Sequence, residues 1–418
     1  MKHVPWKRLF GFAVSPALSA LAPLLILPVI SRELGVAAWS AIAIGQSVGL
    51  ASAVIVAWGW NIIGPTAVAS MNPTARNVYY VHSFRVRFVI LAGVSVIGSL
   101  IVFLTVHHDF LFAALAMAFA LALSGLSATW YFVGSGEPLK LLTYEAIPKF
   151  IAALVAIPLV IIFHRAEIYP VVLGVFVGLG VFAADRHVRK SRTRVAHNGR
   201  DLVQAFMLNG PIASSQLLAT TYTSLSVTLV SVGAMGNVVL IASFAAGFRL
   251  LNLFQAGLAA IMTGFQGWVA ESWNTDVRRH VNTAIAATLS GSFMVAVALG
   301  CFLGPTATWL FGDDIVFDSR SSILLAVAFF SYSLTACSAL FLLVPSGNTN
   351  IIAVATGCAS VVAIIAIVWF SSMWGLAGGC AAILLSELVV LAVEAPVIIR
   401  VFRTVQASSH GFSRSAGF

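Results

Sequence analysis

The middle of this 418-residue chain reads Arg186-His187-Val188-Arg189-Lys190-Ser191-Arg192-Thr193-Arg194, and the basic segment continues to Arg200. Long apolar runs lie on both sides of it, since 60% of the chain is hydrophobic and only 9% is charged. Soluble domains carry about 25% charged residues. The composition therefore argues against a soluble enzyme, a nucleic-acid-binding domain and a disordered protein, and it predicts a polytopic helical membrane protein.

The apolar runs define the expected membrane spans. A helix that crosses a bilayer needs about 20 mainly apolar residues. Runs of this kind occupy residues 10–31, 37–59, 86–106, 110–134, 142–163, 167–185, 205–232, 237–264, 283–304, 321–344, 350–370 and 375–399. They are continuous rather than alternating, which excludes a membrane β-barrel. We expect an all-α polytopic membrane protein of about twelve transmembrane helices, the first of them uncleaved.

The basic segment divides these runs into two sets of six. The predicted organisation is an N-terminal six-helix lobe (1–185), a basic cytoplasmic linker (186–201), a C-terminal six-helix lobe (202–404) and a cytoplasmic tail (405–418). Two sets of six helices are typical of transporters built from structural repeats. Pro16, Pro23 and Pro28 in the first run and Gly210-Pro211 in the seventh predict kinks at corresponding positions of the two lobes.

The basic residues predict the orientation. With the N-terminus inside, the loops place nearly all of the 23 Lys and Arg residues, Arg87 among them, on the cytoplasmic side. Only Arg32, Arg165 and Arg320 fall outside, which agrees with the positive-inside rule. We therefore expect a multi-pass protein of the cytoplasmic (inner) membrane with both termini in the cytoplasm. The net charge of +9 then reflects topology and is no sign of a nucleic-acid partner.

Arg249 lies near the middle of the eighth run. An arginine at that depth costs about 2.5–3.5 kcal/mol on insertion scales. The cost is tolerated where the side chain faces a wet cavity or an anion, which makes Arg249 a candidate substrate-binding residue. The alternative is an arginine that is satisfied by backbone carbonyls or a carboxylate and serves packing.

The seventh run is unusually polar for a membrane helix. Asn209, Gln216, Thr220 and Thr223 fall on one narrow stripe of a helical wheel. The stripe fits a hydrated wall compatible with sugars, although Ser and Thr also link membrane helices through hydrogen bonds. Two further candidates for substrate contact, each with a structural alternative, are Gln46 in the second run and Gln255 in the eighth.

Three carboxylates are candidates for ion coupling. Glu387 and Glu394 are seven residues apart on the last run and so share a helix face. Intramembrane carboxylates of this kind often couple transport to protons or Na⁺. Glu145 lies four residues before Lys149 near the cytoplasmic end of the fifth run, so the two predict either an interfacial ion pair or an ion-coupling carboxylate next to a substrate-binding lysine.

Catalytic signatures are absent from the sequence. No G-x-S-x-G, H-E-x-x-H, Walker A or dinucleotide-binding motif occurs in a fitting context. We therefore expect no enzyme activity, no cofactor and no metal. Any transport uses an ion gradient or runs downhill.

Three segments resemble a known family. Ile30-Ser31-Arg32-Glu33-Leu34-Gly35-Val36-Ala37-Ala38-Trp39 resembles the first loop of Wzx-type polysaccharide flippases of the multidrug/oligosaccharidyl-lipid/polysaccharide superfamily. Gly59-Trp60-Asn61 is similar to the "G-F-N" segment that closes their second helix, and Ser243-Phe244-Ala245-Ala246-Gly247-Phe248-Arg249-Leu250 to an aromatic–Ala–Arg stretch of their eighth helix.

The resemblance implies two six-helix lobes around a central cavity that opens alternately to each side. The implied function is translocation of a polyprenyl-diphosphate-linked oligosaccharide for surface polysaccharide biosynthesis. In this interpretation Arg249 meets the diphosphate, and Asn61 joins the candidate substrate-binding residues. The implied partners are the lipid-linked glycan, the bilayer, a glycan polymerase and glycosyltransferases.

Two other functions stay open at this stage. One is an ion-coupled small-molecule exporter (an antiporter) of the same superfamily. A major-facilitator carrier would need a G-x-x-x-D-R-type loop, which residues 72–77 lack. The other is a membrane-embedded glycosyltransferase or polymerase, which usually has a large external loop that the sequence does not show.

Overall fold

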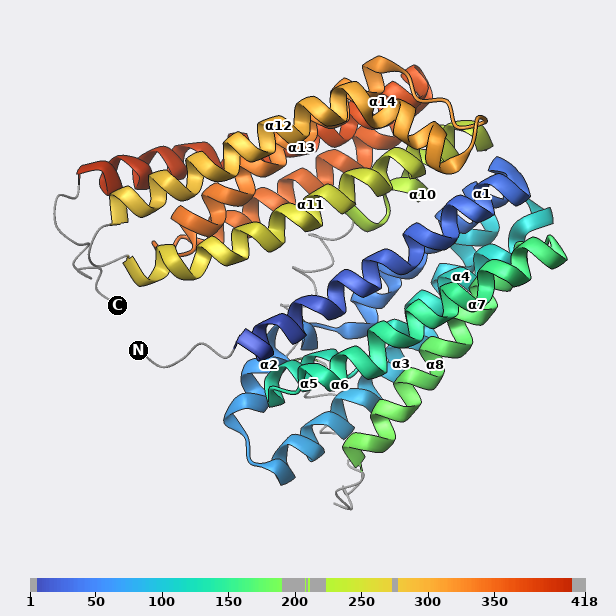
Figure 1. Ribbon diagram of the computed structural model, residues 1–418, viewed down its shortest axis with the longest axis horizontal. Helices are drawn as coiled ribbons and strands as arrows, with labels where there is room; N and C mark the ends of the chain where they lie inside the picture. Colours follow the sequence, from blue (N-terminus) through green and yellow to red (C-terminus); the bar gives the residue numbers. More distant parts are fainter. Residues whose placement is uncertain (1–5, 190–206, 208–209, 211–222, 273–276, 408–418) are drawn as a thin grey trace. The chain divides into compact units, whose positions relative to one another are not determined.

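The computed structural model describes residues 6–189, 207, 210, 223–272 and 277–407. The regular elements of this part are all helical (Figure 1). In chain order they are α1 (Trp6–Ala57), α2 (Trp60–Ser70), α3 (Pro73–Thr105), η1 (His108–Phe110), α4 (Leu111–Ser124), α5 (Thr129–Ser135), α6 (Pro138–Leu141), η2 (Leu142–Ala146), α7 (Ile147–Phe163), α8 (Ile168–Arg189), α10 (Ser226–Gly233), α11 (Val238–Ser272), α12 (Val277–Phe311), α13 (Ser319–Ser338), η3 (Ala339–Leu343) and α14 (Thr349–Ala407).

Among the described residues, nine helical stretches are long and apolar enough to cross a membrane. They confirm the all-α, multi-pass class. The chain divides into two compact units, Met1–Val232 with Gly236–Ala242 and Gly233–Met235 with Ser243–Phe418. The predicted lobe boundaries stay a prediction. Most of the predicted linker lies outside the described residues, and α8 continues into its first part, to Arg189.

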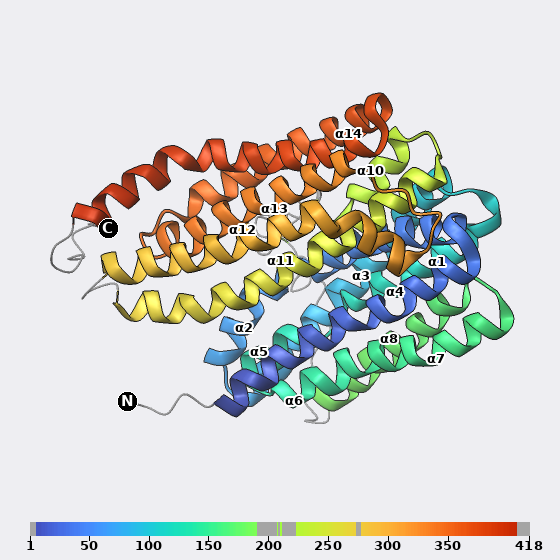
Figure 2. The same cartoon turned by 45° about the horizontal axis from the view of Figure 1, so that its top comes forward.

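Two of the long helices consist of two arms joined at a glycine. Gly35 in α1 has φ 81° and ψ 172°, and Gly375 in α14 has φ 59° and ψ −132°. A residue without a Cβ adopts positive φ at little cost. Figures 1 and 2 show α1 and α14 each reversing direction between two arms. The arms account for the first two and the last two predicted spans, and of the twelve only the seventh, 205–232, lies mostly outside the described residues.

The third helix begins thirteen residues before its predicted start. It starts at Pro73 because Asn72 caps it, accepting a hydrogen bond from the Ala75 backbone N–H at 2.9 Å, and because proline suits the first helical position. Arg87 therefore lies inside α3 and is fully buried. Its assignment to a cytoplasmic loop is wrong.

In the first unit, α1 and α4 pack through small residues. A Cβ on Gly45 would lie 2.4 Å from the Ala114 carbonyl oxygen, and one on Gly49 would lie 2.7 Å from that of Ala118. Membrane helices use small residues in this way because the absent side chains let two backbones approach closely.

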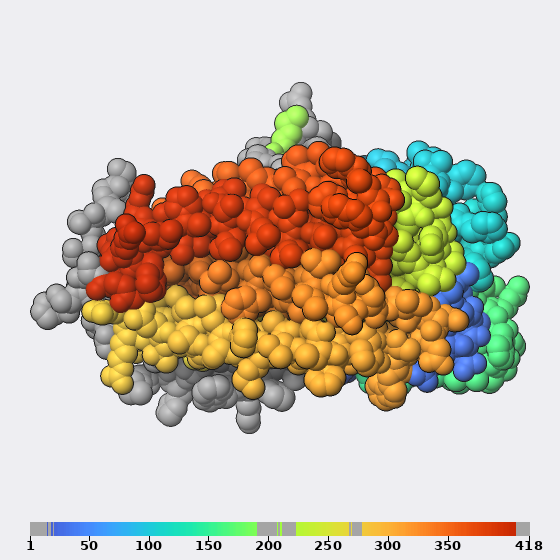
Figure 3. All heavy atoms as spheres, turned by 90° about the horizontal axis from the view of Figure 1, so that it is seen from above, coloured from blue at the N-terminus to red at the C-terminus, as the bar shows by residue number. Residues whose placement is uncertain are grey.

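In the second unit, Figure 3 shows α14 (red) and α12 (orange) along one face.

This close contact gives a stability prediction. The substitution Gly45→Ala should lower the unfolding free energy by about 1–3 kcal/mol, as overpacking does, because the new methyl group meets backbone that cannot rotate away. The measurement is the thermal unfolding of the purified protein. Gly93→Ala on α3, where a Cβ meets nothing within 4 Å, is the matched control. Equal melting temperatures for the two variants would contradict the packing argument.

Candidate functional site

A break in the fourth predicted span is the starting point of the site. α4 ends at Ser124, α5 begins at Thr129, and the residues between them are not helical. Irregular backbone at membrane depth needs partners for its polar groups. Arg87 supplies them, since its Nη1 donates to the carbonyl oxygens of Gly125 at 3.1 Å and of Ser127 at 2.8 Å.

Arg87 is enclosed on all sides. None of its surface is exposed, its Nη2 lies 3.4 Å from Ser83 Oγ, and its guanidinium lies 5.6 Å from the centre of the Trp130 ring. Carbonyl dipoles and an aromatic face thus stabilise the charge. Sequence reasoning missed this residue. The signal that could have revealed it is the Asn72-Pro73 helix start, which places Arg87 four turns into a helix.

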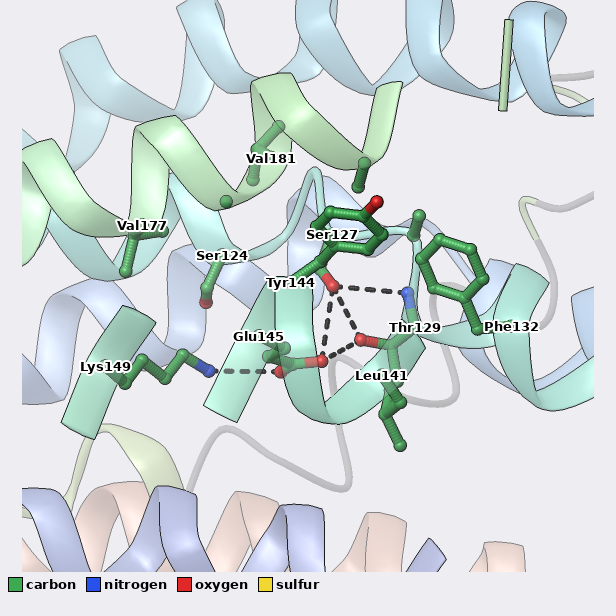
Figure 4. Close-up of a pocket in the computed structure, with 13 residues that line it drawn as sticks. Ser124, Ser127, Thr129, Phe132, Leu141, Tyr144, Glu145, Lys149, Val177 and Val181 are labelled. Carbon is green, nitrogen blue, oxygen red and sulfur yellow. Dashed lines mark hydrogen bonds and ion pairs between the residues drawn. The ribbon is translucent and has the colours of Figure 1, made fainter. Parts of the chain in front are cut away.

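A second irregularity faces the break. The segment η2 is π-helical, a geometry that often marks functional sites, and it carries Glu145. The Oε2 of Glu145 accepts hydrogen bonds from Thr129 Oγ1 and, at 3.3 Å, from Ser127 Oγ. Its Oε1 lies 3.0 Å from Nζ of Lys149. Figure 4 shows these side chains converging from the break, α5, η2 and α7.

The four groups line a pocket inside the first unit. Its walls come from α4, the break, α5, α6, η2, α7 and α8, and its cavity volume is about 20 Å³, open at the protein surface. Ser124 adds a third hydroxyl, while Val177, Val181 and Ala184 of α8 form an apolar side. At Gly180 α8 approaches η2 so closely that a Cβ would lie 2.4 Å from the Tyr144 carbonyl oxygen. The pocket is therefore polar on one wall and apolar on the other.

The other sequence candidates of the first unit do not join this pocket. Gln46 is buried in α1, Asn61 is exposed in the first turn of α2, and Thr223 is exposed just before α10. The remaining members of the predicted polar stripe, Asn209, Gln216 and Thr220, lie outside the described residues. The structure thus brings together Glu145 and Lys149, and the stripe stays a prediction.

In the second unit, Arg249 lies half-buried on α11. The preceding turns are tightly packed: Phe244 and Phe248 stack with ring centres 5.5 Å apart, and Gly247 lies against the Phe317 ring. Gln255, also half-buried, follows on the same helix. Arg249 therefore projects from a rigidly held segment.

The second unit also contains the two carboxylates of the last span. Glu387 and Glu394 lie on the second arm of α14 and are only 4% and 1% exposed. The Oε2 atom of Glu394 has no hydrogen-bond partner among the described residues. An ionised carboxylate without a partner is costly in an apolar interior, so the buried position of Glu394 is unfavourable for a bare negative charge.

The role of Arg87 can be tested by stability. Arg87→Met removes the donors to both carbonyls of the break, and each carbonyl left without a partner costs about 1–3 kcal/mol. We expect a clearly lower melting temperature for this variant, and partial recovery with Arg87→Lys. Arg85→Met, two residues earlier on the same helix and half-buried, is the control and should melt close to the wild type. If both methionine variants melt alike, Arg87 does not support the break.

No protein-family model matches the chain, and no curated protein matches it. Solved structures do resemble it. The inward-facing form of a multidrug resistance MATE family transporter of the MOP superfamily gives a TM-score of 0.69 at 14% identity, over 94% of this chain and 96% of that one. The lipid II flippase MurJ, in an inward closed conformation, gives 0.68 at 14% identity, over 94% and 89%. A MOP superfamily transporter from Pyrococcus furiosus gives 0.59 at 14% identity, over 96% and 95%. The chain shares the fold of MOP superfamily transporters along nearly its whole length.

Proposed function

We propose that this protein moves a polyprenyl-diphosphate-linked oligosaccharide across the cytoplasmic membrane by alternating access, as a flippase of the Wzx type. Arg249 is the observation that carries the proposal. It lies half-buried in a helix long and apolar enough to span the membrane, a position where a cation is kept for a polar path or an anion. The fold shared with a lipid II flippase supports the same substrate class.

The chemistry of the substrate explains the polar residues within the spans. A glycan drawn through hydrocarbon would lose the hydrogen bonds of many hydroxyl groups, each at a cost. Side chains that replace water lower this cost, and an arginine can hold the diphosphate through charge-assisted hydrogen bonds. In the proposal Arg249 binds the diphosphate, and the glycan is contacted by Gln46, Asn61, Lys149, Asn209, Gln216, Thr220, Thr223 and Gln255.

A small-molecule exporter is the second candidate function. The observation that favours it is the equally good structural agreement with a multidrug resistance MATE family transporter. In either case we propose that Glu387, with Glu394 beside it on α14, couples transport to protons or Na⁺. Their burial supports this role, because an exposed carboxylate gains little from binding a cation.

Transfer between leaflets tests the function. Proteoliposomes that carry a labelled lipid-linked glycan should show its movement to the opposite leaflet with no chemical change. Arg249→Ala should slow transfer at least about tenfold, since a hydrogen bond to a charged group contributes about 1.5–3 kcal/mol, and Arg249→Lys should retain part of the rate.

The control for this experiment is Arg320→Ala, on the exposed first turn of α13, which should transfer normally. A wild-type transfer rate for Arg249→Ala would contradict the proposal that Arg249 binds the diphosphate. A lengthened glycan or a lost diphosphate would show an enzyme. Transport of cationic drugs without glycan transfer would favour the exporter.

Ion coupling predicts a separate result. Collapse of an imposed pH or Na⁺ gradient should slow transfer by the wild type, and Glu387→Gln should make transfer insensitive to that gradient because an amide cannot exchange a cation. Glu33→Gln, at an exposed carboxylate near the reversal in α1, should keep the gradient response. A normal response in Glu387→Gln would exclude this residue from coupling.

A further inference from the structure

The Glu145 pocket has the composition of a cation site that already contains a cation. The two carboxylate oxygens are divided between different partners. Oε2 accepts hydrogen bonds from the Ser127 and Thr129 hydroxyls, and Oε1 meets the Lys149 ammonium at 3.0 Å. Ser124 brings a third hydroxyl to the same pocket. The ammonium thus contacts one oxygen of the carboxylate, and neutral hydroxyls hold the other oxygen in the same pocket.

The charges inside the pocket balance only while Lys149 is present. Glu145 and Lys149 are the charged side chains among its lining residues. Arg87 lies behind the break, and its Nη1 is engaged by the carbonyls of Gly125 and Ser127. Without the ammonium, Glu145 would be a carboxylate in a largely buried pocket with only hydroxyl partners, and such a group binds a counter-ion strongly.

The oxygen set indicates which cation would replace the ammonium. Carboxylate and hydroxyl oxygens suit hard cations, and Ca²⁺ usually takes 6–8 oxygens that include several carboxylates. This pocket offers one carboxylate, and the described residues contain no group of three or more His, Cys, Asp or Glu side chains placed to hold a metal. A singly charged cation balances the charge of Glu145, whereas a doubly charged one leaves an excess.

We propose that the Glu145 pocket is a binding site for a small monovalent cation such as Na⁺, in which the Lys149 ammonium is the resident occupant. The ammonium can leave without movement of the backbone, since it sits at the end of a four-carbon stem. The side chains of Lys149 and Glu145 are 19% and 24% exposed, so the pocket opens at the protein surface. The inference concerns cation binding at Glu145 and does not depend on which substrate the protein moves.

Removal of the resident cation tests the proposal. Lys149→Met keeps the length of the side chain but leaves Glu145 without its counter-ion. We expect this variant to melt at a lower temperature than the wild type in choline chloride, and to gain a saturable few degrees when NaCl replaces choline chloride at constant ionic strength. Tryptophan fluorescence of the purified protein in detergent follows the unfolding. Lys149→Gln serves as a second variant if the methionine protein does not fold.

Matched variants separate a site from a general salt effect. The double variant Glu145→Gln/Lys149→Met should lose the Na⁺ response, and Thr129→Val/Lys149→Met should need more Na⁺ for the same gain. Glu145→Gln alone should respond to Na⁺ as the wild type does, because Lys149 already fills the site there.

Three results would overturn the proposal. The first is a folded Lys149 variant whose melting temperature ignores Na⁺. The second is stronger stabilisation of that variant by CaCl₂ than by NaCl at equal ionic strength. The third is a Na⁺ response of the wild type that Glu145→Gln abolishes. Each is a stability measurement, so its outcome is independent of whether the glycan is transported.

Discussion

Arg87 and the two carbonyl groups it binds hold the first unit in its observed form. A membrane helix normally satisfies its own backbone, and the break after Ser124 leaves carbonyls that lipid cannot satisfy. The Arg87 Nη1, at 3.1 and 2.8 Å from the carbonyl oxygens of Gly125 and Ser127, takes the place of the missing helical donors. Because the negative end of the α4 dipole points at this arginine, the break and the buried charge stabilise each other.

The polar pocket follows from that interaction. In a continuous helix the hydroxyls of Ser127 and Thr129 would point in directions about 200° apart. Because the helix is interrupted before Thr129, both hydroxyls reach the same oxygen of Glu145. The π-helical η2 presents Glu145 from the other side, next to Lys149 on the following turn. Two departures from regular helix thus create one site.

Much of the architecture could be predicted from the sequence, because burial in a membrane demands long apolar runs. The runs located the helices well, and the four-residue spacing of Glu145 and Lys149 correctly indicated an ion pair. Hydropathy predicts helix boundaries poorly where the end of a helix contains polar residues. Hydropathy alone puts the start of α3 too late because its first turns contain Arg76 and Asn77, although Asn72-Pro73 marks the start.

The contacts of Arg87 could not be predicted in the same way. Its partners lie 38 and 40 residues further along the chain, and carbonyl oxygens leave no mark on a sequence because every residue has one. The residues Ser127 and Thr129 are equally inconspicuous, since Ser and Thr are common in membrane helices. Only the fold shows which hydroxyls face a carboxylate.

The glycine contacts between α1 and α4 bear on how the first unit can move. At Gly45 and Gly49 the two helices meet backbone to backbone, so no layer of long side chains lies between them to change rotamer and let one helix slide past the other. The helix α4 and the second arm of α1 therefore behave as one rigid body. Movement inside the unit is therefore expected between helices that are separated by larger side chains, or at Gly35, the glycine that precedes the second arm of α1.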